Sequence, residues 1–409
     1  MTDTIVIIGA GQAGAQVAAS LRQNKFEGKI VLIGDEPVLP YQRPPLSKRY
    51  LAGELEKERL FIKPAAFYDK MKIDLVLGDA VKSINSQQHT VLLNSDQIFH
   101  YKHLIIATGG RVRTLTCPGA THQHVHYLRT LADVDAMHSD FTEGTRLVVI
   151  GGGYIGLETA AVAIKHGLKV TLLEALPAVL NRVTSPEVSQ FFESVHQQAG
   201  VTLYNNTAVT AIEESDAEDK TAIVITDKGH RLPADMVVVG IGLLANVELA
   251  AAAGIACDNG ITVDEYGRTS IDNVYAAGDC ANHPSSIYNR RMRLESVHNA
   301  IEQGRTVAAT ICGKDKPYNQ VPWFWSDQYD LKLQTAGINS GYDQTIIRGD
   351  ITSRSFAVFY LKQGRLLAVD AINRPAEFVA ARNIITKGIP VNPQHLQDDS
   401  FAAKDLAKT

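Results

Sequence analysis

Two copies of one strand–turn–helix–strand pattern, each built on a glycine string, constrain this chain more than any other feature of its sequence. In the first copy, an apolar run from Thr4 to Ile8 leads into the string GAGQAG at 9–14, and a helical pattern then extends to about Arg22. A second apolar run, Lys29 to Ile33, comes next, and Asp35 follows it. The order of these elements predicts a βαβ unit with parallel strands.

The glycines of the first string suit a turn that receives a dinucleotide. Gly9 permits a tight turn, Gly11 lets the backbone approach a pyrophosphate, and Gly14 lets the helix pack closely on the strand. The helix N-terminus would offer free N–H groups and a partial positive charge to that pyrophosphate. Asp35, 21 residues beyond Gly14, is placed to accept from a ribose hydroxyl. A glycine string alone would be weak evidence because such turns are common, but the flanking strands, helix and acid favour the dinucleotide interpretation.

The second copy begins 142 residues later. A strand from Arg146 to Ile150 leads into GGGYIG at 151–156, and a later strand, Lys169 to Leu173, ends at Glu174. The candidate nucleotide contacts of this unit are Gly151, Gly153, Tyr154, Ile155, Gly156 and Glu174. Two dinucleotide sites in one chain predict two dinucleotides, and the usual pair is a flavin and a nicotinamide.

Small residues also end three later strands. Thr108 and Gly109 follow a strand that ends at Ala107, Gly242 follows the strand 236–239, and a third strand, 274–279, ends in Asp279. Small residues at strand ends let the backbone lie against a bound cofactor, although a plain crossover turn would use them too.

Composition excludes several other classes of protein. The net charge is −4 over 409 residues, so no global basic field attracts nucleic acid or an anionic membrane. The four cysteines are far apart in sequence and form no C-x-x-C, so neither a disulfide framework nor a metal site is expected. The longest apolar stretch, 147–164, contains four glycines and Glu158 and would span a membrane poorly. With no basic leader before Ile5, we expect a soluble, cytoplasmic protein.

Three further strings make the chain recognisable: RPPLSK at 43–48, AGDC at 277–280 and PWFWSDQ at 322–328. With the paired glycine strings, they resemble the FAD-dependent pyridine nucleotide reductases, in particular the putidaredoxin-reductase-like group, over essentially the whole chain. This resemblance implies a glutathione-reductase-like α/β fold with two Rossmann-like dinucleotide-binding domains and a C-terminal α/β domain. The implied boundaries are 1–112 and 246–320 for a split FAD domain, 113–245 for an NAD domain and 321–409 for the C-terminal domain.

The resemblance also implies the site residues. The FAD contacts that it places on this chain are Ala13, Asp35, Lys48, Val81, Arg129, Asp279 and Val297. Lys48 and Glu158 would form an ion pair that orients the flavin and nicotinamide rings, although each taken alone could be a solvated surface charge. Trp325 resembles a residue that covers the flavin on the ferredoxin-facing side, and core packing is the alternative for Trp323 beside it. His298 stands where relatives often have proline, either as a plain substitution or as a titratable neighbour of the flavin.

The implied activity is that of an NADH:ferredoxin oxidoreductase. Hydride would pass from NADH to FAD, and single electrons would then pass to an acidic 2Fe–2S ferredoxin that serves a haem mono-oxygenase. Glu174 and the absence of Arg or Lys from 175–181 favour NADH over NADPH. Basic residues expected to attract the ferredoxin are Arg290, Arg291, Arg293, Arg305, Arg382 and Lys387.

Other functions stay open on the same fold. The protein could instead reduce a rubredoxin or the ferredoxin of a ring-hydroxylating dioxygenase. A disulfide or peroxide reductase is disfavoured because the first hundred residues contain no cysteine. A redox-regulated signalling flavoprotein is disfavoured because neither a targeting segment nor a strongly basic composition is evident.

Overall fold

The computed structural model describes residues 3–215 and 221–407, and by its internal contacts the chain divides into two compact units. The first unit comprises 1–42, 57–111 and 244–324, and the second comprises 43–56, 112–243 and 325–409. The short segment 43–56 therefore packs with the second unit, although it lies inside the stretch 1–112. The division into three domains at 112, 245 and 320 stays a prediction.

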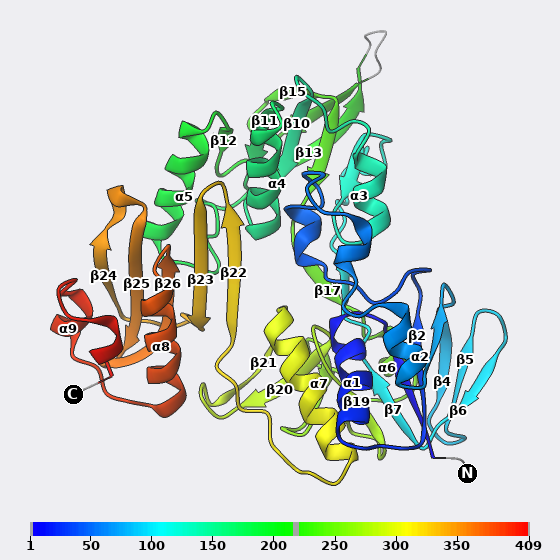
Figure 1. The fold of residues 1–409 in the computed structure, drawn as a ribbon. Helices are drawn as coiled ribbons and strands as arrows, with labels where there is room; N and C mark the ends of the chain where they lie inside the picture. Colours follow the sequence, from blue (N-terminus) through cyan, green and yellow to red (C-terminus); the bar gives the residue numbers. More distant parts are fainter. Residues whose placement is uncertain (1–2, 216–220, 408–409) are drawn as a thin grey trace. The chain divides into compact units, whose positions relative to one another are not determined.

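The first unit is built on a parallel sheet of five strands in the order β19-β7-β1-β2-β3 (Figure 1). Its strands are β1 (Thr4–Ile8), β2 (Lys29–Gly34), β3 (Ile73–Leu77), β7 (His103–Ile106) and β19 (Val274–Ala276). Helices α1 (Gln12–Gln23) and α7 (Val297–Ile311) lie side by side on one face (Figure 1). They pack on alternate residues of the central strands, such as Ile5, Ile7 and Leu32.

The opposite face of this sheet packs against a small antiparallel sheet. Val6, Ile8 and Val31 on that face form one apolar core with Val91 and Leu93. The small sheet consists of β4 (Val81–Asn85), β5 (Thr90–Leu93) and β6 (Ile98–His100). The unit also contains α2 (Ala65–Lys70), α6 (Glu248–Ala252), β18 (Ile261–Thr262), β20 (Ala281–Ser285) and β21 (Arg290–Arg293). Because both faces are covered, the strands of the parallel sheet are continuous apolar runs.

The second unit contains its own parallel sheet in the order β12-β11-β10-β16-β9. Its elements are β9 (Val125–Tyr127), α3 (Leu131–Met137), β10 (Arg146–Ile150), α4 (Tyr154–Lys165), β11 (Lys169–Leu173), α5 (Pro186–Gln198), β12 (Thr202–Tyr204) and β16 (Met236–Val239). Three antiparallel strands pack on one face through Ile212 and Val224: β13 (Val209–Glu214), β14 (Ala222–Thr226) and β15 (Arg231–Ala234). β8 (Gly110–Val112) pairs with β17 (Leu243–Ala245) where the chain passes from one unit to the other.

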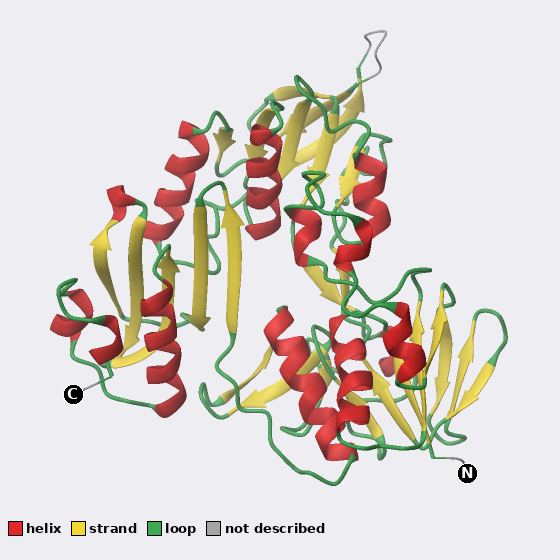
Figure 2. Cartoon of the chain, in the orientation of Figure 1, coloured by secondary structure: helices red, strands yellow, loops and turns green. Residues whose placement is uncertain are grey.

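From Trp325 onward the second unit contains a five-stranded sheet in the order β22-β23-β26-β25-β24, with α8 along one face (Figure 2). The first two residues of β22 group with the first unit. The bounds are β22 (Trp323–Gln328), β23 (Leu331–Gly337), β24 (Gln344–Asp350), β25 (Ser355–Lys362), β26 (Arg365–Ile372), α8 (Pro375–Lys387) and α9 (Pro393–Gln397). Within the described ranges no helix is long and apolar enough to cross a membrane, and no group of His, Cys, Asp and Glu is arranged to hold a metal ion.

Candidate functional site

The first glycine string has the geometry of a turn that leaves room for a ligand. Gly9 has φ 108°, and a methyl group there would lie 2.2 Å from the carbonyl oxygen of Ala107. At Gly14 a methyl group would lie 1.9 Å from the carbonyl oxygen of Gly9, so only glycine lets α1 approach β1. At Gly11, by contrast, a methyl group would meet no atom of the described chain within 4 Å. The open side of Gly11, just before the start of α1, is where a pyrophosphate could approach the backbone.

The second string repeats this geometry in the second unit. Gly151 again has φ 108°, and a methyl group there would lie 2.4 Å from the carbonyl oxygen of Gly240. A methyl group at Gly156 would lie 2.0 Å from the carbonyl oxygen of Gly151. Gly153 is open within the described residues, as Gly11 is. Both turns therefore fit a bound dinucleotide.

Glu174 contacts the second string directly. Its Oε2 accepts from the Gly152 N–H at 2.7 Å, and its Oε1 accepts from the Leu176 N–H at 2.7 Å. The carboxylate thus holds the glycine turn to the end of β11, a role that the spacing of the sequence did not indicate. Each oxygen keeps capacity for a further hydrogen bond, so acceptance from a ribose hydroxyl stays a prediction. In the first unit the corresponding Asp35 is exposed.

Three of the remaining residues predicted to contact a flavin, Thr108, Gly109 and Asp279, lie at the carboxyl edge of the parallel sheet of the first unit. β1, β7 and β19 are paired in parallel, and Thr108, Gly109 and Asp279 follow two of them. In open α/β sheets, ligands bind at this edge. The Thr108 hydroxyl donates to the carbonyl of Asn246 at 2.7 Å and so fixes the crossover. Val81 opens β4, and Val297 opens α7, whose N-cap Ser296 accepts from the Asn299 N–H.

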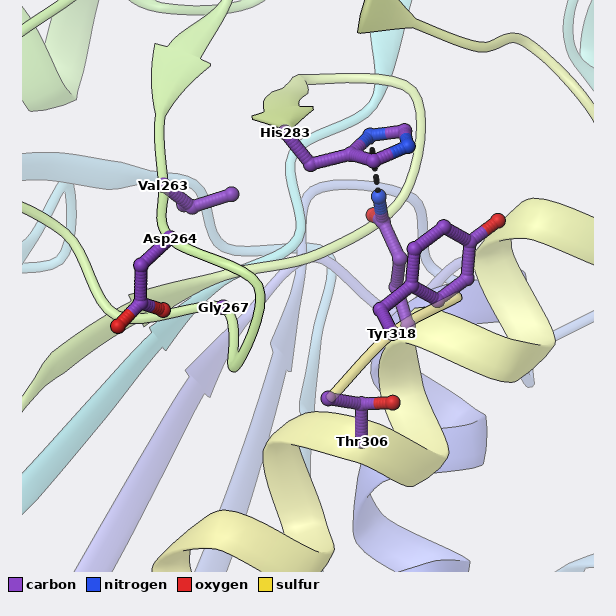
Figure 3. A pocket seen from close by; sticks show the side chains of 7 residues that line it. Val263, Asp264, Gly267, His283, Thr306 and Tyr318 are labelled. Carbon is purple, nitrogen blue, oxygen red and sulfur yellow. Dashed lines mark hydrogen bonds between the residues drawn. The ribbon is translucent and has the colours of Figure 1, made fainter. Parts of the chain in front are cut away.

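A small cavity beside α7 shows how the Asp279 loop is held (Figure 3). Gln303 accepts from the Gly278 N–H at 2.7 Å and hydrogen-bonds Nδ1 of His283 at 2.9 Å. Burial lowers the pKa of His283 to about 4, so its ring is neutral at neutral pH. Residues lining the cavity are Val263, Asp264, Gly267, His283, Gln303, Thr306 and Tyr318. Gln303 therefore positions the residue before Asp279, and no sequence motif identified it.

His298 is buried at the start of α7, and its ring lies 5.5 Å from that of Trp323. Both residues belong to the first unit. An aromatic contact of this kind is compatible with a packing role for both side chains. Trp325 belongs to the second unit and is partly buried in β22.

Lys48 and Glu158 form an ion pair inside the second unit. Nζ of Lys48 lies 2.7 Å from Oε2 of Glu158, and the side chain of Glu158 is 1% exposed. Hydroxyls from Ser47 and Ser326 donate to the two carboxylate oxygens at 2.5 and 2.6 Å. Burial raises the pKa of Glu158 above the usual value, while Lys48 and the two hydroxyls act in the opposite direction. The alternative of two solvated surface charges is wrong, because Glu158 is among the most buried charged residues of the described chain.

The other predicted residues of the second unit are spread around its parallel sheet. Tyr154 and Ile155 open α4, where burial raises the pKa of Tyr154 and Ile155 is exposed. Gly242 has φ 109° at the end of the β16 crossover. The backbone carbonyl of Arg129 accepts from the Arg43 guanidinium at 2.6 Å. Ser47, Ser326 and Gln303 are the site residues that the sequence did not single out, although the first two lie within strings already recognised.

No disulfide joins any of the four cysteines. All four are free thiols, and Cys280 beside Asp279 is fully buried. Burial raises the pKa of Cys280 and favours the unreactive thiol form. Cys280 therefore gives no support to a disulfide or peroxide reductase that uses a thiolate at this position.

Two parallel sheets, each with an open glycine turn at the start of a helix, define a two-dinucleotide oxidoreductase of the flavoprotein type. The chain belongs to the pyridine nucleotide-disulphide oxidoreductase family, whose model matches residues 3–304, and a reductase C-terminal domain matches 323–407. This membership implies the use of FAD and NAD(P)H.

Ferredoxin reductases are among the similar proteins and match over nearly their whole length. Putidaredoxin reductase CamA of Pseudomonas putida is 46% identical, covering 99% of this chain and 96% of that protein. Rhodocoxin reductase of Rhodococcus erythropolis is 44% identical, covering 98% and 93% respectively. The crystal structure of the covalent putidaredoxin reductase–putidaredoxin complex matches with a TM-score of 0.96 and 45% identity, covering 99% of this chain and 98% of that chain. The predictions of fold class, of family and of an oxidoreductase of the ferredoxin-reductase type are confirmed.

Proposed function

We propose that this protein oxidises NADH and reduces a 2Fe–2S ferredoxin that supplies a haem mono-oxygenase. The observation that carries the proposal is the likeness to ferredoxin reductases over the whole chain, including the C-terminal domain at 323–407. The relatives also include a rubredoxin reductase and reductases of dioxygenase systems, at lower identity. These make a rubredoxin or a dioxygenase ferredoxin the second candidate acceptor.

The residues of the first unit would hold FAD. The open backbone at Gly11 and the start of α1 would take the pyrophosphate, Asp35 a ribose hydroxyl and Asp279 a ribityl hydroxyl. The start of α7 at Val297 would direct its partial positive charge towards the flavin. When bound, FAD accepts a hydride and releases electrons one at a time.

The second unit would hold and orient NADH. Gly153 would receive the pyrophosphate at the start of α4, and Glu174 would accept from the adenosine ribose. The Lys48–Glu158 pair would fix the rings in the geometry that hydride transfer needs, since orientation contributes much of the rate in such reactions. No general acid or base of the protein is required for this step.

The test of the cofactor is the ratio of kcat/KM for NADH and NADPH. A 2′-phosphate would meet the Glu174 carboxylate and no Arg or Lys within 175–181, so we expect a preference for NADH of about ten- to a hundredfold. Replacement of Glu174 by Gln should reduce this ratio. Because Glu174 also holds Gly152, the ratio is the informative quantity and the absolute rate is not. Equal values for the two cofactors in the natural protein would refute the assignment.

The test of the acceptor is turnover with purified proteins of the three kinds. A 2Fe–2S ferredoxin of a haem mono-oxygenase system should support faster reduction than a dioxygenase ferredoxin or a rubredoxin at equal concentration. Faster turnover with either of the other two would favour the second candidate.

A further inference from the structure

The buried Lys48–Glu158 pair is one end of a longer chain of hydrogen bonds within the second unit. Ser326, which contacts Glu158, accepts from Nε2 of Gln328 at 3.1 Å. The Oε1 atom of Gln328 lies 2.8 Å from Nε2 of His196. Nδ1 of His196 lies 3.0 Å from the hydroxyl of Tyr329. The chain thus runs from α4 through β22 to α5 and ends in the turn after β22.

The interior members of this chain are closed off from solvent. Glu158, Ser326 and Gln328 are each 1% exposed and His196 is 0% exposed, whereas Tyr329 at the far end is 37% exposed. Burial lowers the pKa of His196 to about 4, so at neutral pH the ring carries a single proton. That proton can lie on either ring nitrogen, and the hydrogen-bond partners decide which one carries it.

Glu158 determines the direction of every bond in the chain. The Lys48 ammonium group, 2.7 Å from Oε2, favours the ionised form of Glu158 against the effect of burial. An ionised carboxylate only accepts, so the Ser326 hydroxyl must donate to it and must accept from the Gln328 amide. The Gln328 oxygen then faces His196, which must carry its proton on Nε2, and Tyr329 must donate to Nδ1. A neutral side chain that donates a hydrogen bond from the Oε1 position of Glu158 would exchange donor and acceptor in each of these bonds. The Gln328 side-chain amide would then have to rotate so that its oxygen and nitrogen change places.

We infer that the protonation state of Glu158 and the tautomer of His196 are coupled through Ser326 and Gln328, which makes Gln328 and His196 positioning residues for the Lys48–Glu158 ion pair. With the hydrogen bonds directed as described, the Ser326 hydroxyl donates to Glu158. This donation favours the ionised carboxylate beside Lys48. Among the residues that the structure describes, the charged and titratable groups that face Glu158 are Lys48 and Tyr154, and the group that faces His196 is Tyr329. The importance of this for hydride transfer rests on the proposed function, but the coupling itself does not.

The test is the ¹⁵N spectrum of the flavin-bound protein labelled at histidine, with His196 assigned by its absence in His196→Asn. At neutral pH the natural protein should carry the His196 proton on Nε2. In Glu158→Gln, Lys48 and Ser47 retain the amide oxygen, so the amide N–H groups face Ser326 and the proton should move to Nδ1. Lys48→Met provides a second variant, because without the ammonium group the buried Glu158 should take up a proton and give the same reversal. Retention of the Nε2 proton in both variants would overturn the inference.

Two controls separate coupling through the chain from a general disturbance. In Gln328→Leu the chain is cut, so adding Glu158→Gln should cause no further change in the His196 spectrum. In Tyr329→Phe the proton should stay on Nε2, because Glu158 and not Tyr329 sets the polarity. A reversal in Tyr329→Phe, or a response to Glu158→Gln in the protein that already carries Gln328→Leu, would contradict the proposed route.

The kinetic consequence is measured separately. Gln328→Leu should lower the limiting rate of flavin reduction several-fold and change KM for NADH little, since the ion pair loses its orientation and not its charge. If the tautomer reverses in Glu158→Gln while flavin reduction is unchanged, the coupling stands and the placement of the pair beside the flavin fails. If flavin reduction slows but the tautomer does not reverse, the proposed function stands and the coupling fails.

Discussion

Glu158 and Asp370 are both carboxyl groups removed from water in the second unit, and the difference between them lies in their partners. Glu158 contacts the ammonium group of Lys48. Asp370 instead accepts from the neutral hydroxyls of Tyr360 and Thr335, at 2.5 and 2.7 Å. Burial outweighs these two hydrogen bonds and raises the pKa of Asp370 to about 6. At the scale of single residues, burial raises the pKa of both acids, and only Glu158 has a neighbouring cation that opposes this rise.

The Lys48–Glu158 pair should affect the rate of hydride transfer more than the binding of NADH. Lys48→Met and Glu158→Gln should each lower the limiting rate of flavin reduction, measured by stopped flow at saturating NADH, while raising Kd less. The matched control is Lys165→Met, which removes an exposed pair with Glu54 in the same unit and should leave the rate unchanged. If the limiting rate is unaltered in both variants, the buried pair has a structural role and does not assist hydride transfer.

Asp370 should make the protein less stable as the pH rises from about 4 to 6. Its folded pKa is raised from 3.8 to about 6, so its contribution is fully present below about pH 4 and is lost as the pH rises through 6. The change is about 3 kcal/mol. Asp370→Asn should lack this pH-dependent change in stability. The free energy of unfolding of both proteins is measured in urea at each pH. The difference between them removes the contribution of the buried histidines, which both proteins contain. Parallel stability profiles would show that Asp370 is ionised in the folded state.

At the scale of elements, the two strand–turn–helix units were predictable because each glycine acts on its own neighbourhood. Gly9, Gly14, Gly151 and Gly156 are required by contacts within a few residues or with the adjacent strand, and such constraints repeat as a short string. Ser326 could not be assigned in this way, since its partner Glu158 is 168 residues away in sequence. The same holds for His196 and Gln328, which are 132 residues apart. A hydrogen bond between distant segments leaves no periodic pattern that a single sequence could reveal.

The glycines of one string should differ in what they do when replaced by alanine. Gly11→Ala meets open space, so the protein should fold normally but lose FAD affinity at least about tenfold, because the methyl group would occupy the approach of the pyrophosphate. Gly14→Ala meets the Gly9 carbonyl and should cost about 1–3 kcal/mol of stability. Flavin content and thermal unfolding measure the two effects.

In the second unit, Gly153→Ala is the control variant for Gly11→Ala. It should weaken NADH binding and leave FAD content unchanged, since Gly153 has the same open geometry as Gly11. If Gly11→Ala retained FAD with unaltered affinity, the open side of the first string would not be the pyrophosphate site.

At the scale of the whole molecule, the net charge of −4 means that attraction of an acidic ferredoxin must come from a local group of basic residues. The structure reduces the number of basic residues whose replacement would test docking alone. Arg291 donates to the carbonyls of Val263 and Asn282, and Arg293 contacts the Asp279 carbonyl and Glu295, so both serve the fold of the first unit. Their reversal would disturb the Asp279 loop as well as any docking surface.

Arg290 and Arg305 are the candidates in the first unit whose replacement tests docking most directly. Both are exposed, and Arg305 pairs with Glu302 on its own helix. Turnover with ferredoxin should fall steeply as salt shortens the Debye length to about 10 Å at 0.1 M, whereas NADH reduction of an uncharged dye should not. Arg290→Glu with Arg305→Glu should raise KM for ferredoxin and leave flavin reduction by NADH unchanged. The control is Lys29→Glu, which reverses an exposed charge at the amino end of β2, the opposite edge of the sheet from the predicted flavin contacts. Turnover that is independent of salt, or an equal rise in KM for the control, would place the docking surface elsewhere.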